Sequence, residues 1–401
     1  MARQGTNRER FGGEPVATVT AKGARRVRDG HPWVFRTDLL QAPDLPGGAV
    51  VRVADEHGNF LGQAFWAARS RIALRILTRR DEPCDRAFFA RRVADAVALR
   101  RRLWPEGEAY RAIHGEADLL PGLFVDRYGD ALSVQTASEG AEVHLDLFVE
   151  LLAAELAPRV IVEKNDASAR DFEGLPRRQG ILFGGPEARA SYAEGPNRFD
   201  LDLLGDLKTG AFLDQRENHL RVAEYLPAGG EGLDLFSYHG GFALSLATRA
   251  ARVTAVEADE TAAGRIRANA AKNGRPVEVI HGNVFDVGRA LEREGRRFDV
   301  VVLDPPAFAK RKSEAQTADR AYKELNLRAL KLVKPGGVLV TCSCSGKMTA
   351  DRFAAVLASA FADVKRPVQL LERRGAGRDH PVSPQVPETE YLKCWVYRVL
   401  G

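Results

Sequence analysis

The segment formed by residues 232–243 constrains the fold of this chain more than any other. An apolar run ends at Asp234, a short loop with Gly240 and Gly241 follows, and a helical pattern begins at Phe242. This order predicts a strand, a tight turn and a helix, in which glycine lets the backbone approach a ligand closely. The glycine spacing differs from the G-x-G-x-x-G of dinucleotide-binding folds, so the segment alone does not identify the ligand.

Three later apolar segments each end in a polar residue, and these residues are Glu257, Asn283 and Asp304. Helical patterns separate the segments, which predicts a parallel sheet with helical crossovers. Ligands of such sheets bind beyond the carboxyl ends of the strands, where Asp234 also falls. An acid about twenty residues after the glycine loop suits a ribose diol. The alternative role for Glu257, capping a helix, is filled better by Asp259.

Two cysteines mark the end of a fifth apolar strand within residues 338–346. Cys342 and Cys344 are two of only four cysteines in 401 residues. Alternate residues of a strand share a face, so the two can pair, bind a metal or act singly. No further Cys-x-x-Cys or His-rich spacing accompanies them, so the sequence predicts no metal site. The Asp-Pro-Pro sequence that begins at Asp304 is expected at the same edge of the sheet. A nucleophilic cysteine is therefore favoured there over an inert buried thiol.

Five motifs share an order along the chain, and they are Lys208–Arg216, Phe236–Phe242, Asp304–Phe308, Tyr322–Asn326 and Ser343–Gly346. Together they resemble the S-adenosylmethionine-dependent methyltransferases that make 5-methylcytosine in 23S ribosomal RNA, the large-subunit methyltransferase I type. The resemblance extends from Ala21 to the end of the chain. The sequence departs from the family pattern at three places: Glu257 replaces a common Asp, Gly282-Asn283 replaces an acidic pair, and Cys342 is an additional cysteine.

The resemblance implies a role for each matching residue. Cys344 adds to C6 of cytosine as the nucleophile, and Asp304 holds the edge of the base. The residues expected to bind S-adenosylmethionine are Lys208, Asp234, Phe236, Ser237, Tyr238, Gly240, Glu257, Asn283 and Asp304. The residues expected to contact RNA are Pro305, Pro306, Phe308, Tyr322, Lys323, Arg25 and Arg26. Tyr322 and Lys323 lie near the start of a predicted helix, where they face either the site or solvent.

We expect a multi-domain chain. Its parts are a disordered tail (1–14), a small PUA-like β-barrel (15–80), an α+β central domain (81–190), and a doubly wound, Rossmann-like α/β class I methyltransferase domain (191–401). The His-Pro-Trp-Val-Phe sequence at residues 31–35 resembles the PUA RNA-binding module of this family. Basic residues around it suit an RNA backbone, although a solvated protein face has the same composition.

The central domain carries no catalytic pattern. Asp85 precedes a helical pattern over residues 86–103, where it is placed to cap the helix. Asp118 and Asp126 have no base or nucleophile beside them in the sequence, so a catalytic role for either is disfavoured.

Composition limits the partners and the compartment. The chain has 59 basic and 54 acidic residues, a net charge of +5, which allows RNA binding without requiring it. Four unevenly spaced cysteines favour a reducing compartment, and we expect a cytoplasmic protein. There is no apolar stretch of the ~18 residues that a membrane span needs, and the polar N-terminus does not resemble a secretory signal. The sequence is compatible with a homodimer but does not set the oligomeric state.

Two other functions stay open. An RNA N-methyltransferase can use an Asp-Pro-Pro-x-Phe loop to hold an exocyclic amine, and that chemistry needs no cysteine. A non-catalytic RNA-binding or assembly protein can keep the cofactor pocket without turnover. A nicotinamide-linked oxidoreductase is disfavoured because the glycine spacing is wrong.

Overall fold

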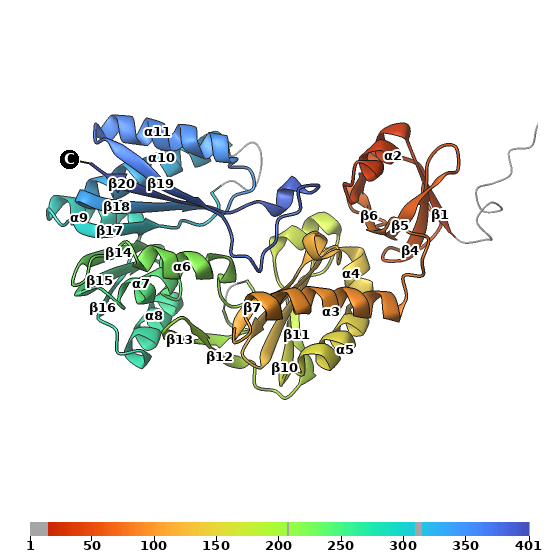
Figure 1. Ribbon diagram of the computed structural model, residues 1–401, viewed down its shortest axis with the longest axis horizontal. Helices are drawn as coiled ribbons and strands as arrows, with labels where there is room; N and C mark the ends of the chain where they lie inside the picture. Colours follow the sequence, from red (N-terminus) through yellow and green to blue (C-terminus); the bar gives the residue numbers. More distant parts are fainter. Residues whose placement is uncertain (1–14, 207, 309–314, 401) are drawn as a thin grey trace, which may run out of the picture. The chain divides into compact units, whose positions relative to one another are not determined.

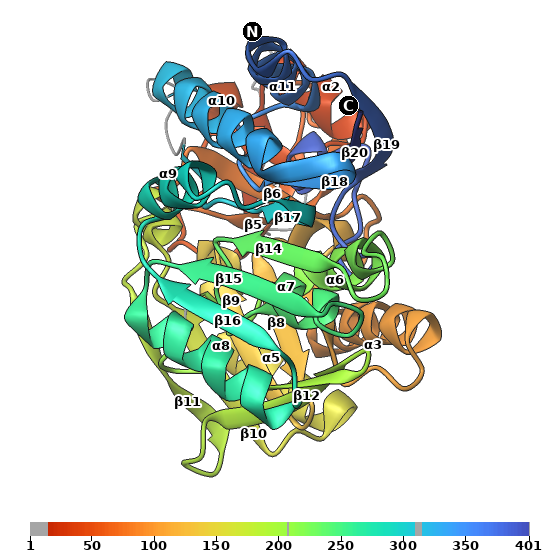
Figure 2. The ribbon, with the colours of Figure 1, turned by 90° about the vertical axis from the view of Figure 1, so that its left-hand side faces the viewer.

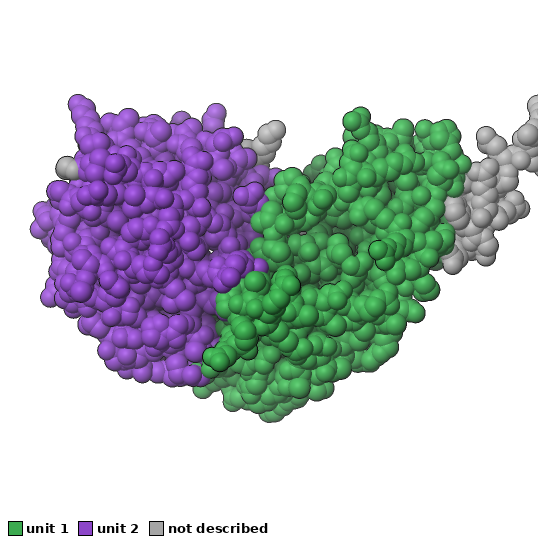
Figure 3. Space-filling model, in the orientation of Figure 1, with its two compact units in different colours: residues 1–191, 201–211, 379–389 green, residues 192–200, 212–378, 390–401 purple. Residues whose placement is uncertain are grey.

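The computed structural model describes residues 15–206, 208–308 and 315–400. The predicted disordered tail, residues 1–14, lies outside the described residues. The chain divides into two compact units (Figure 3). The first unit consists of residues 1–191, 201–211 and 379–389, and the second of residues 192–200, 212–378 and 390–401. No helix within the described ranges is long and apolar enough to cross a membrane.

A six-stranded sheet opens the first unit, with the strand order β2-β6-β5-β4-β1-β3 (Figure 1). Its strands are β1 (Val16–Val19), β2 (Trp33–Phe35), β3 (Leu39–Gln41), β4 (Val50–Ala54), β5 (Phe60–Trp66) and β6 (Ile72–Thr78). β1 runs parallel to β4, whereas the other neighbouring strands are antiparallel. A 3₁₀ turn, η1 (Arg36–Asp38), joins β2 to β3. The short, turn-linked strands match the predicted small β domain.

The basic residues that follow β1 lie on a helix that the sequence analysis did not predict. α2 (Ala21–Arg28) begins after Thr20, whose hydroxyl accepts a backbone N–H of the first turn. Ala24 and Val27 are buried against the sheet, so the arginines point outward. The Arg25 side chain is 85% exposed. The basic surface here is therefore one face of a helix, not one face of a barrel.

A five-stranded sheet in the order β11-β10-β9-β8-β7 forms the rest of the first unit's core. Its strands are β7 (Ala109–His114), β8 (Leu123–Tyr128), β9 (Ala131–Thr136), β10 (Val160–Asn165) and β11 (Arg178–Gly184). The accompanying helices are α3 (Arg86–Leu103), α4 (Glu139–Val143) and α5 (Leu145–Leu156), with the 3₁₀ turns η2 (Gly115–Asp118) and η3 (Ser168–Glu173). Asp85 caps α3 as predicted, because its carboxylate accepts the N–H of Phe88 at 2.9 Å. The sequence analysis missed β7.

The second unit is built on a seven-stranded sheet in the order β16-β15-β14-β17-β18-β20-β19 (Figure 2). The first five strands in this order are parallel, and β20 inserts antiparallel between β18 and β19. Their bounds are β14 (Glu231–Leu235), β15 (Arg252–Glu257), β16 (Val277–His281), β17 (Phe298–Leu303), β18 (Val333–Ser343), β19 (Val368–Arg374) and β20 (Lys393–Val399). A separate antiparallel pair joins β12 (Arg189–Glu194) and β13 (Asn197–Asp202).

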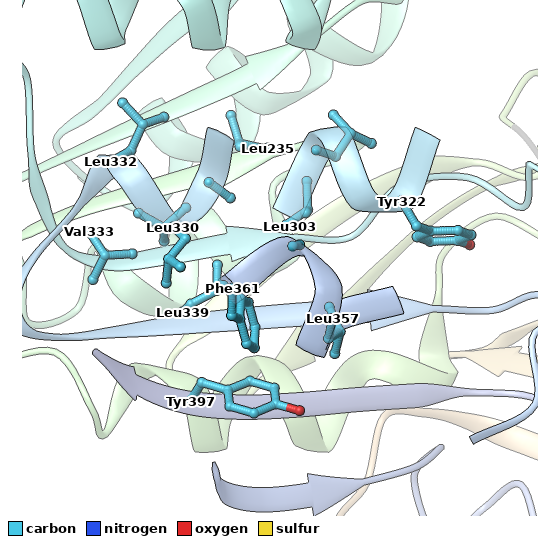
Figure 4. Close-up of a cluster of buried hydrophobic side chains, with 14 of the residues drawn as sticks. Leu235, Leu303, Tyr322, Leu330, Leu332, Val333, Leu339, Leu357, Phe361 and Tyr397 are labelled. Atoms are coloured by element: carbon cyan, nitrogen blue, oxygen red, sulfur yellow. The ribbon is translucent and has the colours of Figure 1, made fainter. Parts of the chain in front are cut away.

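Helices cover both faces of the seven-stranded sheet (Figure 1). α6 (Arg216–Ala223), α7 (Gly241–Leu246) and α8 (Glu260–Lys272) lie on one face, and α9 (Val284–Arg293), α10 (Ala315–Leu332) and α11 (Ala350–Val364) on the other. The main apolar core lies between the sheet and the helices α9, α10 and α11, and it includes Leu303, Leu357 and Tyr397 (Figure 4). The 3₁₀ turns in the described part of the C-terminal half include η4 (Leu213–Gln215) and η6 (Pro387–Thr389).

Candidate active site

The loop after β14 is held in a strained conformation. Phe236 and Tyr238 have positive φ values of 67° and 50°, which residues other than glycine rarely adopt. Gly240 follows with φ 88°, and a Cβ on Gly241 would lie 2.2 Å from Cε1 of His219. The two glycines are therefore required by close packing against α6 and α7, in addition to any ligand. Ser237 closes the turn by donating its hydroxyl to the carbonyl of residue 234 at 2.9 Å.

Asp234 is the penultimate residue of β14, and its carboxylate is almost completely buried. One carboxylate oxygen, Oδ2, accepts the N–H of Ala243 at 3.0 Å. The other, Oδ1, has no hydrogen-bond partner among the described residues. Burial raises the pKa of Asp234 to about 7. This orphaned oxygen at the edge of a glycine loop is the feature of the site that most needs a ligand.

Glu257, at the end of the neighbouring strand β15, ties its own loop to the glycine loop. Its Oε2 accepts the N–H of Tyr238 at 2.8 Å, and its Oε1 accepts two N–H groups from residues 258 and 259. A carboxylate has about four acceptor positions, so one stays available for a hydroxyl. Asp259 caps α8 through the N–H of Ala262, as the sequence analysis expected.

Asn283 is used differently from the other strand-end residues. Its exposed side chain caps α9 by accepting the N–H of Phe285 at 2.9 Å. The structure thus gives it a capping role, and contact with a cofactor stays a prediction.

The aromatic ring of Tyr238 stacks on His239 with centroids 3.7 Å apart, and Phe212 meets the same ring edge-on at 4.8 Å.

Asp304 follows β17 next to the end of β14. Its backbone N–H donates to the carbonyl of Leu235 at 3.3 Å, and its Oδ2 accepts the side-chain amide of Gln215 at 3.0 Å. Pro305 after it is buried, and Pro306 is exposed. The loop therefore presents Asp304 at the strand ends with one carboxylate oxygen oriented by a neighbouring amide.

Tyr322 and Lys323 point in different directions on α10. Tyr322 is fully buried in the core, neither solvent-facing nor open to the site (Figure 4). Its hydroxyl accepts a hydrogen bond from Ser343 at 2.9 Å, and its ring packs edge-on against Phe308 at 5.1 Å. Lys323 instead pairs with Asp363 of α11 at 2.9 Å. Any effect of Tyr322 on a substrate is therefore exerted through Phe308 or Ser343.

The two neighbouring cysteines lie in different surroundings because β18 ends between them. Cys342 is fully buried and lies opposite Cys394 in the β18–β20 pairing. Burial, with Cys394 beside it, raises the pKa of Cys342 well above the usual range of a thiol. Cys344 follows the strand and is partly exposed. Burial also raises the pKa of the partly exposed Cys84, to about 12. Cys344 is thus the thiol best placed to react near Asp304.

Several residues of this region were not singled out by the sequence analysis. Gln215 orients Asp304, and Asp214 accepts the hydroxyl of Tyr391 at 2.7 Å. His219 contacts Glu194 at 2.6 Å; burial alone would lower the pKa of His219, but Glu194 raises it above the usual value. Gln215 and Asp214 belong to a motif quoted above, which was the available signal. His219 and Glu194 had no such signal, because they are distant in sequence.

Lys208, Arg25 and Arg26 belong to the first unit and are described there by themselves. Lys208 is exposed with φ 51°, and the adjacent Thr209 donates its hydroxyl to Asp126 at 2.5 Å. Arg26 is half-buried, and its guanidinium carbon lies over the ring of Phe35 in β2, 4.8 Å from the ring centroid.

Comparison with known proteins agrees with this architecture. Residues 180–395 match the family model of S-adenosylmethionine-dependent methyltransferases, and residues 17–79 match a PUA-like domain. The ribosomal RNA large subunit methyltransferase I of Shewanella denitrificans is 39% identical over 385 residues, covering 94% of this chain and 97% of that protein. The enzyme of the same name from Klebsiella pneumoniae is 36% identical, covering 95% and 98%.

The chain belongs to the ribosomal RNA large subunit methyltransferase I family. The predicted resemblance and fold class, with a PUA-like module and a class I methyltransferase sheet, are confirmed. The crystal structure of SMU.776, described as a methyltransferase and complexed with SAH, shares the fold with a TM-score of 0.82. It is 20% identical, covering 96% of this chain and 100% of that one.

S-adenosylmethionine, the cofactor that membership of this family implies, fits the residues present. The orphaned Oδ1 of Asp234 and the remaining acceptor position of Glu257 lie at neighbouring strand ends, β14 and β15. Both are acceptors, and the amine and ribose hydroxyls of the cofactor are donors. The acceptors of the site therefore suit the donors of this cofactor.

Proposed function

We propose that this protein transfers the methyl group of S-adenosylmethionine to C5 of a cytosine in large-subunit (23S) ribosomal RNA. One observation carries the proposal: a partly exposed thiol, Cys344, lies just beyond the strand that neighbours Asp304. β17 and β18 are parallel, and Leu303 pairs with Thr341, so both groups leave the same edge of the sheet. The names of the relatives support the RNA substrate.

The chemistry explains why a thiol is needed. C5 of cytosine is a weak nucleophile. When the Cys344 thiolate forms a bond to C6, the electrons of the C5–C6 double bond make C5 nucleophilic enough to attack a methyl group. A base then removes the C5 proton, and the sulfur–C6 bond breaks to release the thiolate. Asp304 stabilises the charge that develops on the base by holding N3 or the amino group.

The cofactor supplies an electrophilic methyl group on sulfur. In this proposal, Asp234 and Glu257 hold its polar groups, and the strained turn at Phe236, Ser237, Tyr238 and Gly240 shapes the pocket. Lys208 and Asn283 are assigned to cofactor binding because they occupy positions of the family motifs. Asp304 stands between this pocket and the base, which is why it is assigned to both.

The RNA side of the proposal uses two surfaces. Arg25 and Arg26 on α2 are exposed or half-exposed cations that suit phosphates. Pro305, Pro306 and Phe308 follow Asp304 in the chain and are expected to contact the RNA, and Tyr322 packs against Phe308 from the core. Lys323, which pairs with Asp363, is assigned to RNA binding only because it matches the family motif. The target base has to be unstacked or lie in an open loop to reach a thiol.

The test is methyl transfer from labelled S-adenosylmethionine to ribosomal RNA from a strain lacking this gene, followed by nucleoside analysis. We expect label in 5-methylcytosine. Label in an N-methylated base would favour the RNA N-methyltransferase instead. Tight RNA binding without any transfer would favour the binding or assembly protein.

The proposal extends to the location and organisation of the chain. The four cysteines form no disulfide with one another, which suits the cytoplasm. We propose that the domain boundaries lie near residues 14, 80 and 190, and limited proteolysis tests these positions. The proposed function is compatible with a homodimer, and sedimentation of the full chain measures the oligomeric state.

A further inference from the structure

Lys393 lies beside the segment that carries Cys344. It is the first residue of β20, and it pairs with Ser343, the last residue of β18. Directly opposite residues of antiparallel strands are close neighbours on one face of the sheet. The lysine is therefore fixed by the sheet itself at the point where the chain leaves β18 toward Cys344.

The ammonium group of Lys393 is buried. The residue is 7% exposed, and its Nζ donates to the carbonyl of Ser345 at 2.8 Å and to that of Tyr391 at 2.7 Å. Within the described ranges, no carboxylate lies within ion-pair distance of Nζ. A lysine is rarely buried without an anionic partner, because desolvation of its charge is costly. These contacts leave one N–H of an ammonium, or the lone pair of a neutral amine, for another group.

The group whose charge acts most on Lys393 is Cys344. The pKa of Lys393 is lowered to about 8, because the effect of burial exceeds the opposing effect of negative charge on Cys344 and, to a lesser extent, on Glu390. The other titratable groups nearby have partners of their own. Asp304 accepts the side-chain amide of Gln215, the hydroxyl of Tyr391 donates to Asp214, and the hydroxyl of Tyr322 accepts from Ser343. Cys344 and Lys393 are thus a thiol and an amine whose protonation states depend on each other.

We propose that Lys393 is a positioning residue that holds Cys344 as a thiolate, ready for attack on the base. The S–H bond of Cys344 breaks, its proton joins the Nζ lone pair of Lys393 to complete an ammonium, and the electron pair stays on sulfur. When the sulfur–C6 bond breaks at the end of the cycle, the thiolate returns beside the same ammonium. The catalytic meaning of this pair rests on the proposed function, whereas its effect on the thiol does not.

The experiment measures the thiol directly. Full-length wild type, Lys393→Met, Lys393→Arg and Lys347→Met are alkylated with iodoacetamide between pH 6 and 10, and the Cys344 peptide is quantified by mass spectrometry. In the wild type we expect a midpoint below the ~8.5 of a free thiol. Lys393→Met should raise it by about one unit, so that alkylation at pH 7 slows about tenfold. Lys393→Arg should stay nearer to wild type, because it keeps the charge. Lys347→Met, which removes an exposed lysine three residues from Cys344, should leave the midpoint unchanged.

A wild-type midpoint at or above ~8.5 would overturn the proposal, as would an unchanged midpoint in a folded Lys393→Met protein. Lys393→Gln keeps two N–H donors for the carbonyls of Ser345 and Tyr391, and replaces Lys393→Met if that variant does not fold. Methyl transfer provides a separate readout: kcat should fall at pH 7 and recover at higher pH, with KM for S-adenosylmethionine unchanged. If wild type labels no 5-methylcytosine, the proposed function fails while the alkylation profile still decides the role of Lys393.

Discussion

The five-stranded sheet of the first unit and the seven-stranded sheet of the second both bury charged side chains, but they treat them differently. In the first, Arg100 is completely buried and donates to the carboxylate of Asp118 and to three backbone carbonyls. Arg111 holds both oxygens of the buried Asp126, which also accepts the hydroxyl of Thr209. Each buried charge there has an opposite charge in contact.

At the strand ends of the second sheet the same kinds of groups are incompletely matched. Asp234 keeps one buried oxygen without a partner, and Lys393 contacts only neutral carbonyls. Saturated buried networks rigidify a fold, whereas unmatched groups have altered pKa values and unused hydrogen-bonding positions. Burial of charge alone therefore does not mark a reactive site, whereas a buried charge with no opposite charge in contact has a shifted pKa and can take part in chemistry.

The largest difference in methyl transfer should be between variants of the two cysteines of the second sheet, Cys342 and Cys344. Cys344→Ala is expected to lower methyl transfer by at least about a thousandfold, because the reaction loses its nucleophile. Cys342→Ala, two residues away in the core, should keep activity within about threefold and cost about 1 kcal/mol of unfolding free energy. Initial rates with saturating ribosomal RNA measure both. An inactive Cys342→Ala with an active Cys344→Ala would reverse the assignment.

The saturated network of the first unit should respond in stability instead. Arg100→Met leaves Asp118 buried without its cation, and we expect a loss of about 3–5 kcal/mol of unfolding free energy. Arg101→Met, which removes the neighbouring exposed pair with Glu155, should cost less than about 1 kcal/mol. Urea unfolding measures both. Similar losses for the two variants would show that the buried network is not what distinguishes this sheet.

Asp304 should affect the rate more than the fold. Asp304→Asn keeps the shape of the loop but removes the charge that stabilises the base, so kcat is expected to fall about a hundredfold. Gln215→Ala, which frees Oδ2 of Asp304, should lower kcat by a smaller factor. Steady-state rates at fixed pH, beside melting curves of each variant, make the distinction. Unchanged rates for Asp304→Asn would remove this residue from the mechanism.

Asp234 should cause a pH dependence of the folding stability. Its pKa in the folded chain, about 7, is above the value of an unfolded aspartate. Its stabilising contribution is therefore complete at low pH and is lost as pH rises through 7. Asp234→Asn removes this dependence, so the variant should gain on wild type by up to about 1.4 kcal/mol per pH unit between pH 5 and 7. Urea unfolding of the ligand-free proteins measures the difference. A difference that is independent of pH would mean that Asp234 is not an unmatched acid.

Local patterns made much of the second unit predictable. The strand, glycine turn and helix around Asp234 and the caps at Asp85 and Asp259 depend on neighbouring residues, and the structure has them where the sequence indicates. β19 was missed because it is a half-exposed edge strand with little apolar periodicity. α2 was missed because its arginines obscure a short buried face.

The candidate site was predictable where motifs carry it and not where distant segments meet. Asp304 and Cys344 stand in recognisable motifs. Lys393 begins an ordinary strand, and only the β18–β20 pairing brings it to Ser343. Likewise, a sequence does not distinguish Asp126, whose charge is matched, from Asp234, whose charge is not.

The proposed nucleophile, Cys344, is tested most directly by trapping its bond to the base. RNA containing 5-fluorocytidine allows addition at C6 and methylation at C5 but leaves no C5 proton to remove, so the sulfur–C6 bond persists. We predict a denaturation-resistant protein–RNA complex that requires S-adenosylmethionine, maps to Cys344, disappears in Cys344→Ala and survives in Cys342→Ala. Normal methylation of cytosine C5 with no trapped complex, or a complex attached to another cysteine, would contradict the account.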